Sequence, residues 1–184
     1  KTLNEMSEND ILLYLDTSIM IINPIDNLAL NLQTKDILLF DMTLINGDWT
    51  KKSLLQMMDM DNETVRNTRQ IQAGYLMVKN TQFTRDFVKE WLFWAEKPEA
   101  IMDSPIIDEY PKFIEHRHDQ SILSLLAIKY KDNIKIFPSS AKDEYFFFIK
   151  RTGYFERSYV FLHEVLTPFE KWLSIAANKA LGNR

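Results

Sequence analysis

The chain contains no cysteine and only four glycines among its 184 residues. Without cysteine it can form neither a disulfide nor a thiolate metal site, which fits a reducing compartment such as the cytoplasm. The sequence also has no Gly-x-Gly-x-x-Gly, no Gly-Lys-Ser/Thr and no Gly-x-Ser-x-Gly. A dinucleotide site, a P-loop phosphate site and a serine-elbow hydrolase site are therefore disfavoured.

Long apolar runs and an excess of positive charge are also missing. No apolar stretch approaches the ~20 residues that a membrane-spanning helix needs. The net charge of −4 argues against a general nucleic-acid binder. A hydrophobic fraction of 46% is ordinary for a globular protein, and the length predicts one domain over residues 1–184. Because residues 1–6 read like the end of a helix and do not begin with methionine, we expect the amino-terminal part of a longer protein to be missing.

Apolar runs that predict strands alternate with segments that have the periodicity of helices. Four runs read as strands, namely Asp10–Leu15, Asp36–Asp41, Gln70–Val78 and Ile134–Phe137. Helices are expected over 23–33, 51–58, from Asn80 or Thr81 to Pro98, and over 120–130. Because the strands look buried on both faces and alternate with helices, the sequence predicts a layered α/β/α fold with a largely parallel central sheet.

A last helix is expected over residues 168–184. Its apolar stripe either docks on the domain, which we favour, or lies on a membrane surface, which would make the protein peripherally membrane-associated. The stripe consists of Phe169, Trp172, Leu173 and Ala176.

The segment Glu115–Ser121 concentrates titratable side chains and holds two of the three histidines, His116 and His118. Folding does not require so many ionisable groups together, whereas acid–base work, phosphate binding or sugar binding often does. Asp119 is also well placed to cap the following helix through its carboxylate. The two roles are compatible, so the segment is a candidate site.

Polar residues stand at the ends of two of the predicted strands. Asp16 follows the first strand directly, and ligands of open α/β sheets bind beyond the carboxyl ends of strands. Gln70 and Gln72 flank the small pair Ala73-Gly74, which either allows close approach of a ligand or forms a bulge. Together with the histidines, including His163, these side chains suit hard metals and sugar hydroxyls.

Three stretches taken together resemble glycosyltransferases of the GT-A, nucleotide-diphospho-sugar type, in particular a bacterial and viral subgroup. The stretches are Tyr14–Ser18, Thr68–Gly74 and Glu115–Ser121, and the similarity covers roughly residues 5–138. The resemblance implies a GT-A-like fold whose first nucleotide-binding strands would precede this chain. It also implies a hexosyltransferase-like enzyme of carbohydrate biosynthesis, which uses Mn²⁺ or Mg²⁺ and passes a sugar to a glycan or lipid-linked acceptor.

The resemblance assigns roles to individual residues. Asp16 matches the first acid of the family's Asp-x-Asp motif and would hold metal and donor, while Ser18, a poor metal ligand, replaces the second acid. Asp119 would be the catalytic base if the reaction inverts, and His163 would be a further metal ligand. The residues implied to contact the donor or acceptor are Asp16, Ser18, Gln70, Gln72, Ala73, Gly74, His118 and Gln120.

Two other readings stay open at this point. The replacement of the second acid by Ser18 favours a non-catalytic sugar- or partner-binding domain on the same scaffold. A hydrolase built on Asp16 and Asp119 is a weaker alternative.

Overall fold

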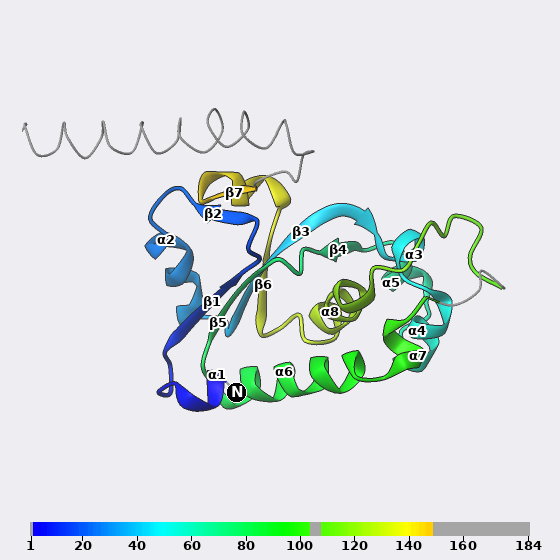
Figure 1. Cartoon of the computed structure of the whole chain (residues 1–184), viewed down its shortest axis with the longest axis horizontal. Helices are drawn as coiled ribbons and strands as arrows, with labels where there is room; N and C mark the ends of the chain where they lie inside the picture. Colours follow the sequence, from blue (N-terminus) through cyan, green and yellow to red (C-terminus); the bar gives the residue numbers. More distant parts are fainter. Residues whose placement is uncertain (1, 104–107, 149–184) are drawn as a thin grey trace, which may run out of the picture.

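The computed structural model describes residues 2–103 and 108–148 of the chain. Their largest feature is a five-stranded mixed sheet in the order β1-β5-β3-β4, with β6 also paired to β3 (Figure 1). The strands are β1 (Ile11–Leu15), β3 (Ile37–Ile45), β4 (Arg69–Ile71), β5 (Tyr75–Lys79) and β6 (Ile134–Phe137). The first and last of these agree with the predicted strands.

The prediction of a largely parallel sheet is wrong. The central strand β5 runs antiparallel to both β1 and β3, and β4 is antiparallel to β3; only the β3–β6 pair is parallel among the described residues. Burial on both faces is confirmed for Ile37–Phe40 but is wrong for the first strand, whose Ile11 and Tyr14 are 45% and 48% exposed. Hydropathy carries no information on strand direction. The predicted strand Gln70–Val78 is in fact two strands, which Gln72–Gly74 separate.

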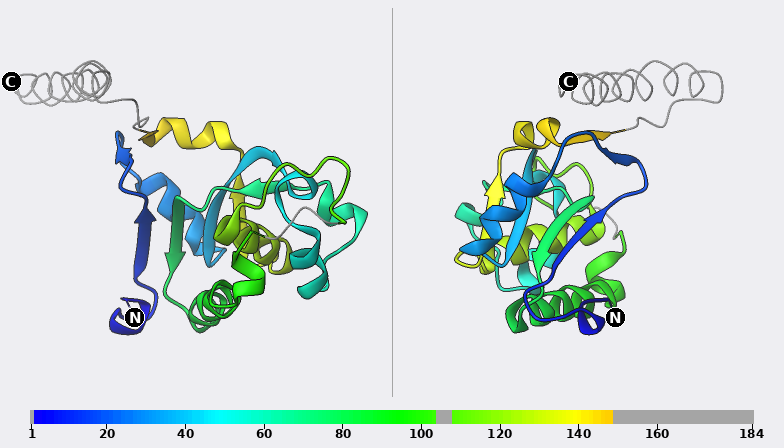
Figure 2. Two further views of the ribbon diagram at one scale, coloured as in Figure 1. Left: turned by 45° about the vertical axis from the view of Figure 1, so that its right-hand side comes forward. Right: turned by 90° about the vertical axis from the view of Figure 1, so that its left-hand side faces the viewer.

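Each face of the sheet packs into its own apolar core. On one face, Ile37 and Leu39 pack with residues of α6 (Gln82–Ala95) and α8 (His118–Lys129). On the other face, Leu38 and Phe40 pack with residues of α2 (Asp26–Ala29) and with the short strand β7 (Phe146–Phe148). Figure 2 shows α2 on one side of the sheet and α6 and α8 on the other. Alternation of side chains along β3 divides the two cores.

The two long helices begin differently. The side chain of Thr81 accepts a hydrogen bond of 3.3 Å from the Thr84 amide, so Thr81 caps α6 as predicted. Helix α8 begins at His118 with Arg117 before it and has no side-chain cap. The prediction that Asp119 is the N-cap is therefore wrong, because Asp119 already lies in the first turn.

The remaining elements are short. Ile19–Ile21 (β2) pairs with β7 in a separate two-stranded sheet. The helix expected over 23–33 is α2 followed by a 3₁₀ turn. The others are α1 (Thr2–Glu5), η1 (Leu30–Gln33), α3 (Asn46–Trp49), α4 (Lys52–Met57), α5 (Glu63–Arg66), α7 (Pro98–Ile101) and η2 (Ser139–Glu144). The helix predicted over 168–184 lies outside the described residues. None of the helices within 2–103 and 108–148 has the length and apolarity needed to cross a membrane.

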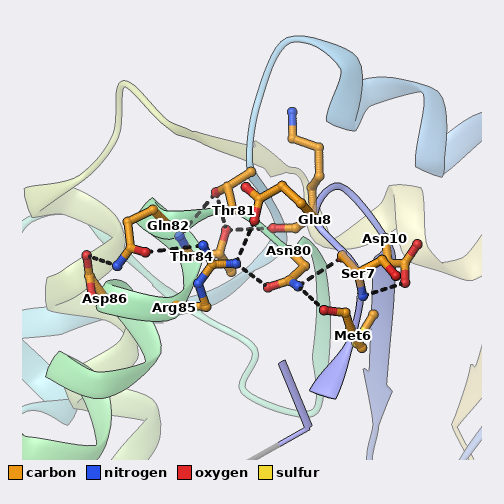
Figure 3. A network of polar contacts seen from close by, with 11 residues as sticks. Met6, Ser7, Glu8, Asp10, Asn80, Thr81, Gln82, Thr84, Arg85 and Asp86 are labelled. Atoms are coloured by element: carbon orange, nitrogen blue, oxygen red, sulfur yellow. Dashed lines mark hydrogen bonds and ion pairs between the residues drawn. The ribbon is translucent and has the colours of Figure 1, made fainter. Parts of the chain in front are cut away.

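A polar network holds the amino-terminal segment against the start of α6 (Figure 3). The side-chain amide of Asn80, only 1% exposed, donates to the carbonyl oxygens of Met6 and Ser7 over 3.1 and 3.0 Å. The Arg85 guanidinium bonds the Asn80 side-chain oxygen at 3.0 Å and the Glu8 carboxylate at 2.9 Å. The network therefore keeps α1 and the start of β1 beside α6.

Candidate functional site

A cavity of about 1040 Å³ lies against the face of the sheet that α6 and α8 flank. Its walls come from α1, from α6 and from the segment Phe113–Gln120. Because side chains alternate along strands, every second residue of β1 and of the chain from Gly74 faces the cavity. The floor consists of three neighbouring cross-strand pairs, Leu12/Val78, Tyr14/Leu76 and Asp16/Gly74.

Six residues to which the resemblance assigned a role line this cavity, and they come from three separate segments. Asp16 follows β1, Ala73 and Gly74 precede β5, and the others belong to the first turn of α8. Those others are His118, Asp119 and Gln120. The fold therefore brings together residues that are far apart in the sequence.

The Asp16 carboxylate is held between two neighbours. The Tyr14 hydroxyl donates a hydrogen bond of 2.8 Å to Asp16 Oδ1. A Cβ atom added to Gly74 would lie 2.8 Å from Asp16 Oδ2, closer than real Cβ contacts come. The pKa of Tyr14 is raised, first by this hydrogen bond, then by burial and by the charges of Asp16 and Asp119. Two carboxylates therefore act on the same end of the cavity.

Gln70 lies beneath the cavity and does not line it. Its amide nitrogen is within hydrogen-bonding distance of the Trp49 carbonyl (3.1 Å), the Thr50 hydroxyl (3.0 Å) and the Ser121 hydroxyl (3.2 Å). Its amide oxygen accepts from the side chain of Gln120 over 2.8 Å. Gln70 is fully buried and therefore cannot contact a ligand directly. Its hydrogen bond instead holds the side chain of Gln120 in place.

The other implied contacts lie elsewhere. Neither Ser18 nor Gln72 lines the cavity. The side-chain oxygen of Gln72 is buried and has no hydrogen-bond partner within the described residues, while its backbone amide donates to Phe40. His163 lies outside the described residues.

The histidines bond the carbonyl groups that end α7, which lack partners within that helix. Nε2 of His116 lies 2.9 Å from the Ala100 oxygen, and Nδ1 of His118 lies 2.9 Å from the Ile101 oxygen. A carbonyl oxygen only accepts, so these ring nitrogens carry the hydrogens. In the neutral rings, Nδ1 of His116 and Nε2 of His118 are then left as acceptors.

The two rings differ in environment. His116 is 4% exposed, and burial is the main cause that lowers its pKa to about 4. Its Nδ1 atom has no hydrogen-bond partner within the described residues. His118 is exposed and has a positive φ of 47°, a conformation that residues with side chains rarely adopt. His118 is therefore the histidine that a ligand can reach.

Asp119 presents an unpaired carboxylate, whereas its backbone is anchored. Its side chain makes no hydrogen bond or ion pair within the part of the chain that the structure describes, and its carbonyl oxygen accepts from the Trp91 indole over 3.2 Å. Trp91 itself packs against the main core and also lines the cavity. The need of an indole N–H for an acceptor was the only sequence signal for this position.

Tyr14 and Leu92 are two further lining residues that sequence reasoning did not single out as ligand contacts. Both are exposed large side chains, at 48% and 56%. Such residues are common on protein surfaces, so their identity alone indicates no site.

The described residues do not by themselves complete a metal-binding set. No group of three or more His, Asp or Glu side chains within 2–103 and 108–148 is arranged to hold a metal ion. Asp16 offers one carboxylate, but its Oδ1 atom already accepts from Tyr14. What the site offers chemically is a free carboxylate, an imidazole acceptor, an anchored amide and an aromatic side chain, the groups that proteins use to bind hydroxyls.

Comparison with known proteins adds no family, since no family model, no curated protein and no solved structure matches this chain.

Proposed function

We propose that the protein is a glycosyltransferase that moves a sugar from a nucleotide-diphospho-sugar to an acceptor hydroxyl. One observation carries the proposal: residues of all three segments that resemble such enzymes line one cavity. Asp16, Gly74 and Asp119 lie in separate parts of the fold. If the resemblance of the three segments were accidental, nothing would require these residues to lie beside the same cavity. The convergence supports a shared ligand site.

The free carboxylate of Asp119 is our candidate for the catalytic base. The attacking acceptor hydroxyl must lose a proton, and a carboxylate without an internal partner can take it. The anchor between Trp91 and the Asp119 carbonyl holds the first turn of α8 in place. His118, the residue before Asp119, also lines the cavity and offers Nε2 as a second acceptor.

Asp16 and Gln120 are our candidates for binding the hydroxyls of the sugars. Each is fixed by a neighbour, Asp16 by Tyr14 and Gln120 by Gln70, so little side-chain freedom would be lost on binding. Preorganised groups of this kind place substrates accurately for reaction.

The leaving nucleoside diphosphate develops negative charge, which a cation must offset. Arg117 lines the cavity and can serve, although it also pairs with Glu115 at 2.9 Å. Mn²⁺ or Mg²⁺ would need ligands beyond the described residues, so we assign no step to a metal.

The test compares two variants by calorimetry and by transfer assays with UDP- and GDP-sugars, each with and without Mn²⁺. Asp119→Asn should bind the donor normally but transfer about 100-fold more slowly, because only the base is lost. Asp16→Asn should lose donor affinity. Asp132→Asn, which removes an exposed carboxylate outside the cavity, is the matched control. If Asp119→Asn transfers sugar as fast as the wild type, Asp119 is not the catalytic base. If the protein binds no sugar nucleotide at all, the proposed function is wrong.

A non-catalytic binding domain is the second candidate, because Ser18 replaces the second acid and the described carboxylates complete no metal set. Sugar-nucleotide binding without transfer or hydrolysis in the same assays would favour it. If the protein hydrolyses sugar nucleotides at a rate that no acceptor increases, the hydrolase built on Asp16 and Asp119 is favoured.

A further inference from the structure

The floor of the cavity changes from polar to apolar along β1 and β5. The pair Asp16/Gly74 is followed by Tyr14/Leu76 and then by Leu12/Val78. Successive pairs on one face of a sheet lie about 7 Å apart, two residues along each strand. The gradient therefore extends for the length of a small amphipathic molecule.

The walls continue this gradient up to the protein surface. Val88 and Leu92 lie one helical turn apart on α6, and Leu3 of α1 closes the far end. Leu92 is 56% exposed whereas Leu3 is 8% exposed, so the apolar wall runs from the surface into the interior. Trp91, bonded to the Asp119 carbonyl, joins this wall to the polar end.

The cationic side chains beside the apolar end already have partners. Arg85 pairs with Glu8 at 2.9 Å, as Figure 3 shows, and Lys89 pairs with Asp86 at 3.1 Å. A phosphate linked to the apolar part of a ligand would have to compete with these carboxylates. The apolar end therefore suits an uncharged chain.

We infer that the acceptor is an amphipathic glycoside whose sugar occupies the polar end and whose uncharged alkyl chain lies along Leu12, Val78 and Leu92. The inference rests on the proposed function, since it names the acceptor class of the same site. Its support is the continuity of the two ends in one cavity of about 1040 Å³. That volume reaches the upper end of the range for small-molecule pockets, about 300–1,000 Å³, and has room for both parts of the ligand.

The test titrates the full chain with methyl, butyl, hexyl and octyl β-glucosides below their micellar concentrations. Each methylene buried along the wall should raise the affinity about fourfold. Leu92→Gln should lower the affinity for octyl glucoside about tenfold and leave that for methyl glucoside unchanged. The matched control is Phe93→Gln, because Phe93 is similarly exposed (53%) and adjacent on α6 but does not line the cavity. This control should bind the whole series as the wild type does.

Three outcomes would overturn the inference. The affinity could be independent of chain length, or Phe93→Gln could weaken binding as much as Leu92→Gln does. Sedimentation could instead reveal a dimer that Leu92→Gln disrupts, which would assign the apolar wall to a second copy of the chain.

Binding of UDP- and GDP-sugars, measured in the same samples, tests the proposed function separately. If the donor binds normally but glucoside affinity does not depend on chain length, only the acceptor assignment is wrong.

Discussion

At the scale of single residues, Asp16 shows how a site carboxylate is positioned. Tyr14 bonds one of its oxygens, and the missing side chain of Gly74 leaves space for the other. Gly74 does not have a positive φ, so its need for glycine arises from this close approach and not from the backbone.

Gly74→Ala should therefore lower the affinity for the sugar nucleotide about tenfold, because the new methyl group must displace the Asp16 carboxylate. The melting temperature should change little, since moving the exposed Asp16 carboxylate breaks only its hydrogen bond to Tyr14, which costs about 1 kcal/mol. Calorimetry with the donor measures the affinity. Gly47→Ala is the control: its Cβ would meet Arg66 at 3.2 Å, away from the cavity, so donor binding should stay normal. Normal donor binding by Gly74→Ala would contradict the role of this contact.

His116 should make stability depend on pH. Burial lowers its pKa from 6.5 to about 4, so between these values the unfolded chain binds a proton that the native protein does not. The free energy of unfolding should thus fall by about 3 kcal/mol as the pH drops from 6.5 to 4, and this contribution is constant above that window.

Urea unfolding from pH 7.5 to 4.5 measures this dependence. His116→Gln should lose that part of the slope, since the titrating group is removed, whereas the exposed His118→Gln should keep it. Identical slopes for wild type and His116→Gln would mean that His116 becomes protonated in the native state without cost.

At the scale of secondary-structure elements, α6 depends on its cap. Thr81→Ala should lower the free energy of unfolding by about 1 kcal/mol, because the Thr84 amide loses its side-chain acceptor. Thr81→Ser keeps a hydroxyl at the same position and should retain most of the stability. Chemical denaturation of both variants measures the difference, and equal losses would assign the effect to the Thr81 methyl group.

The start of α8 is joined to the sheet by the buried amide of Gln70. Gln70→Leu should cost about 2 kcal/mol, because it leaves the Gln120 amide and the hydroxyl of Ser121 without this partner. Donor affinity should fall as well, since Gln120 loses its anchor. Gln33→Leu, an exposed glutamine remote from the cavity, serves as the control and should change neither property. Unchanged stability of Gln70→Leu would show that the network is replaceable.

At the scale of the whole molecule, the cavity exists only in the folded chain, because it combines β1, β5, α6 and α8. A ligand of this site should therefore stabilise the native state by mass action. Donor at 100 times its dissociation constant should add about 2.7 kcal/mol to the free energy of unfolding. Thermal denaturation with and without donor tests this, and Asp16→Asn should remove the shift. A shift of equal size in that variant would place the donor elsewhere.

The sequence alone determined features that depend on neighbouring residues. The strand Ile11–Leu15, the strand Ile134–Phe137 and the cap Thr81 agree with the structure, because hydropathy and capping act over a few residues. The candidate ligand contacts Asp16 and Asp119 were also singled out locally, as polar residues next to apolar segments, and the structure places both beside one cavity.

Only the tertiary structure decided the strand directions, the break at Gln72–Gly74 and the position of Gln70 beneath the cavity. It also placed Asp119 inside the first turn of α8, and it brought Trp91 to the cavity wall. Hydropathy is the same for a buried strand that runs in either direction, and the partner of a buried amide or indole can lie anywhere along the chain. These features therefore arise from contacts between distant residues, which no local pattern encodes.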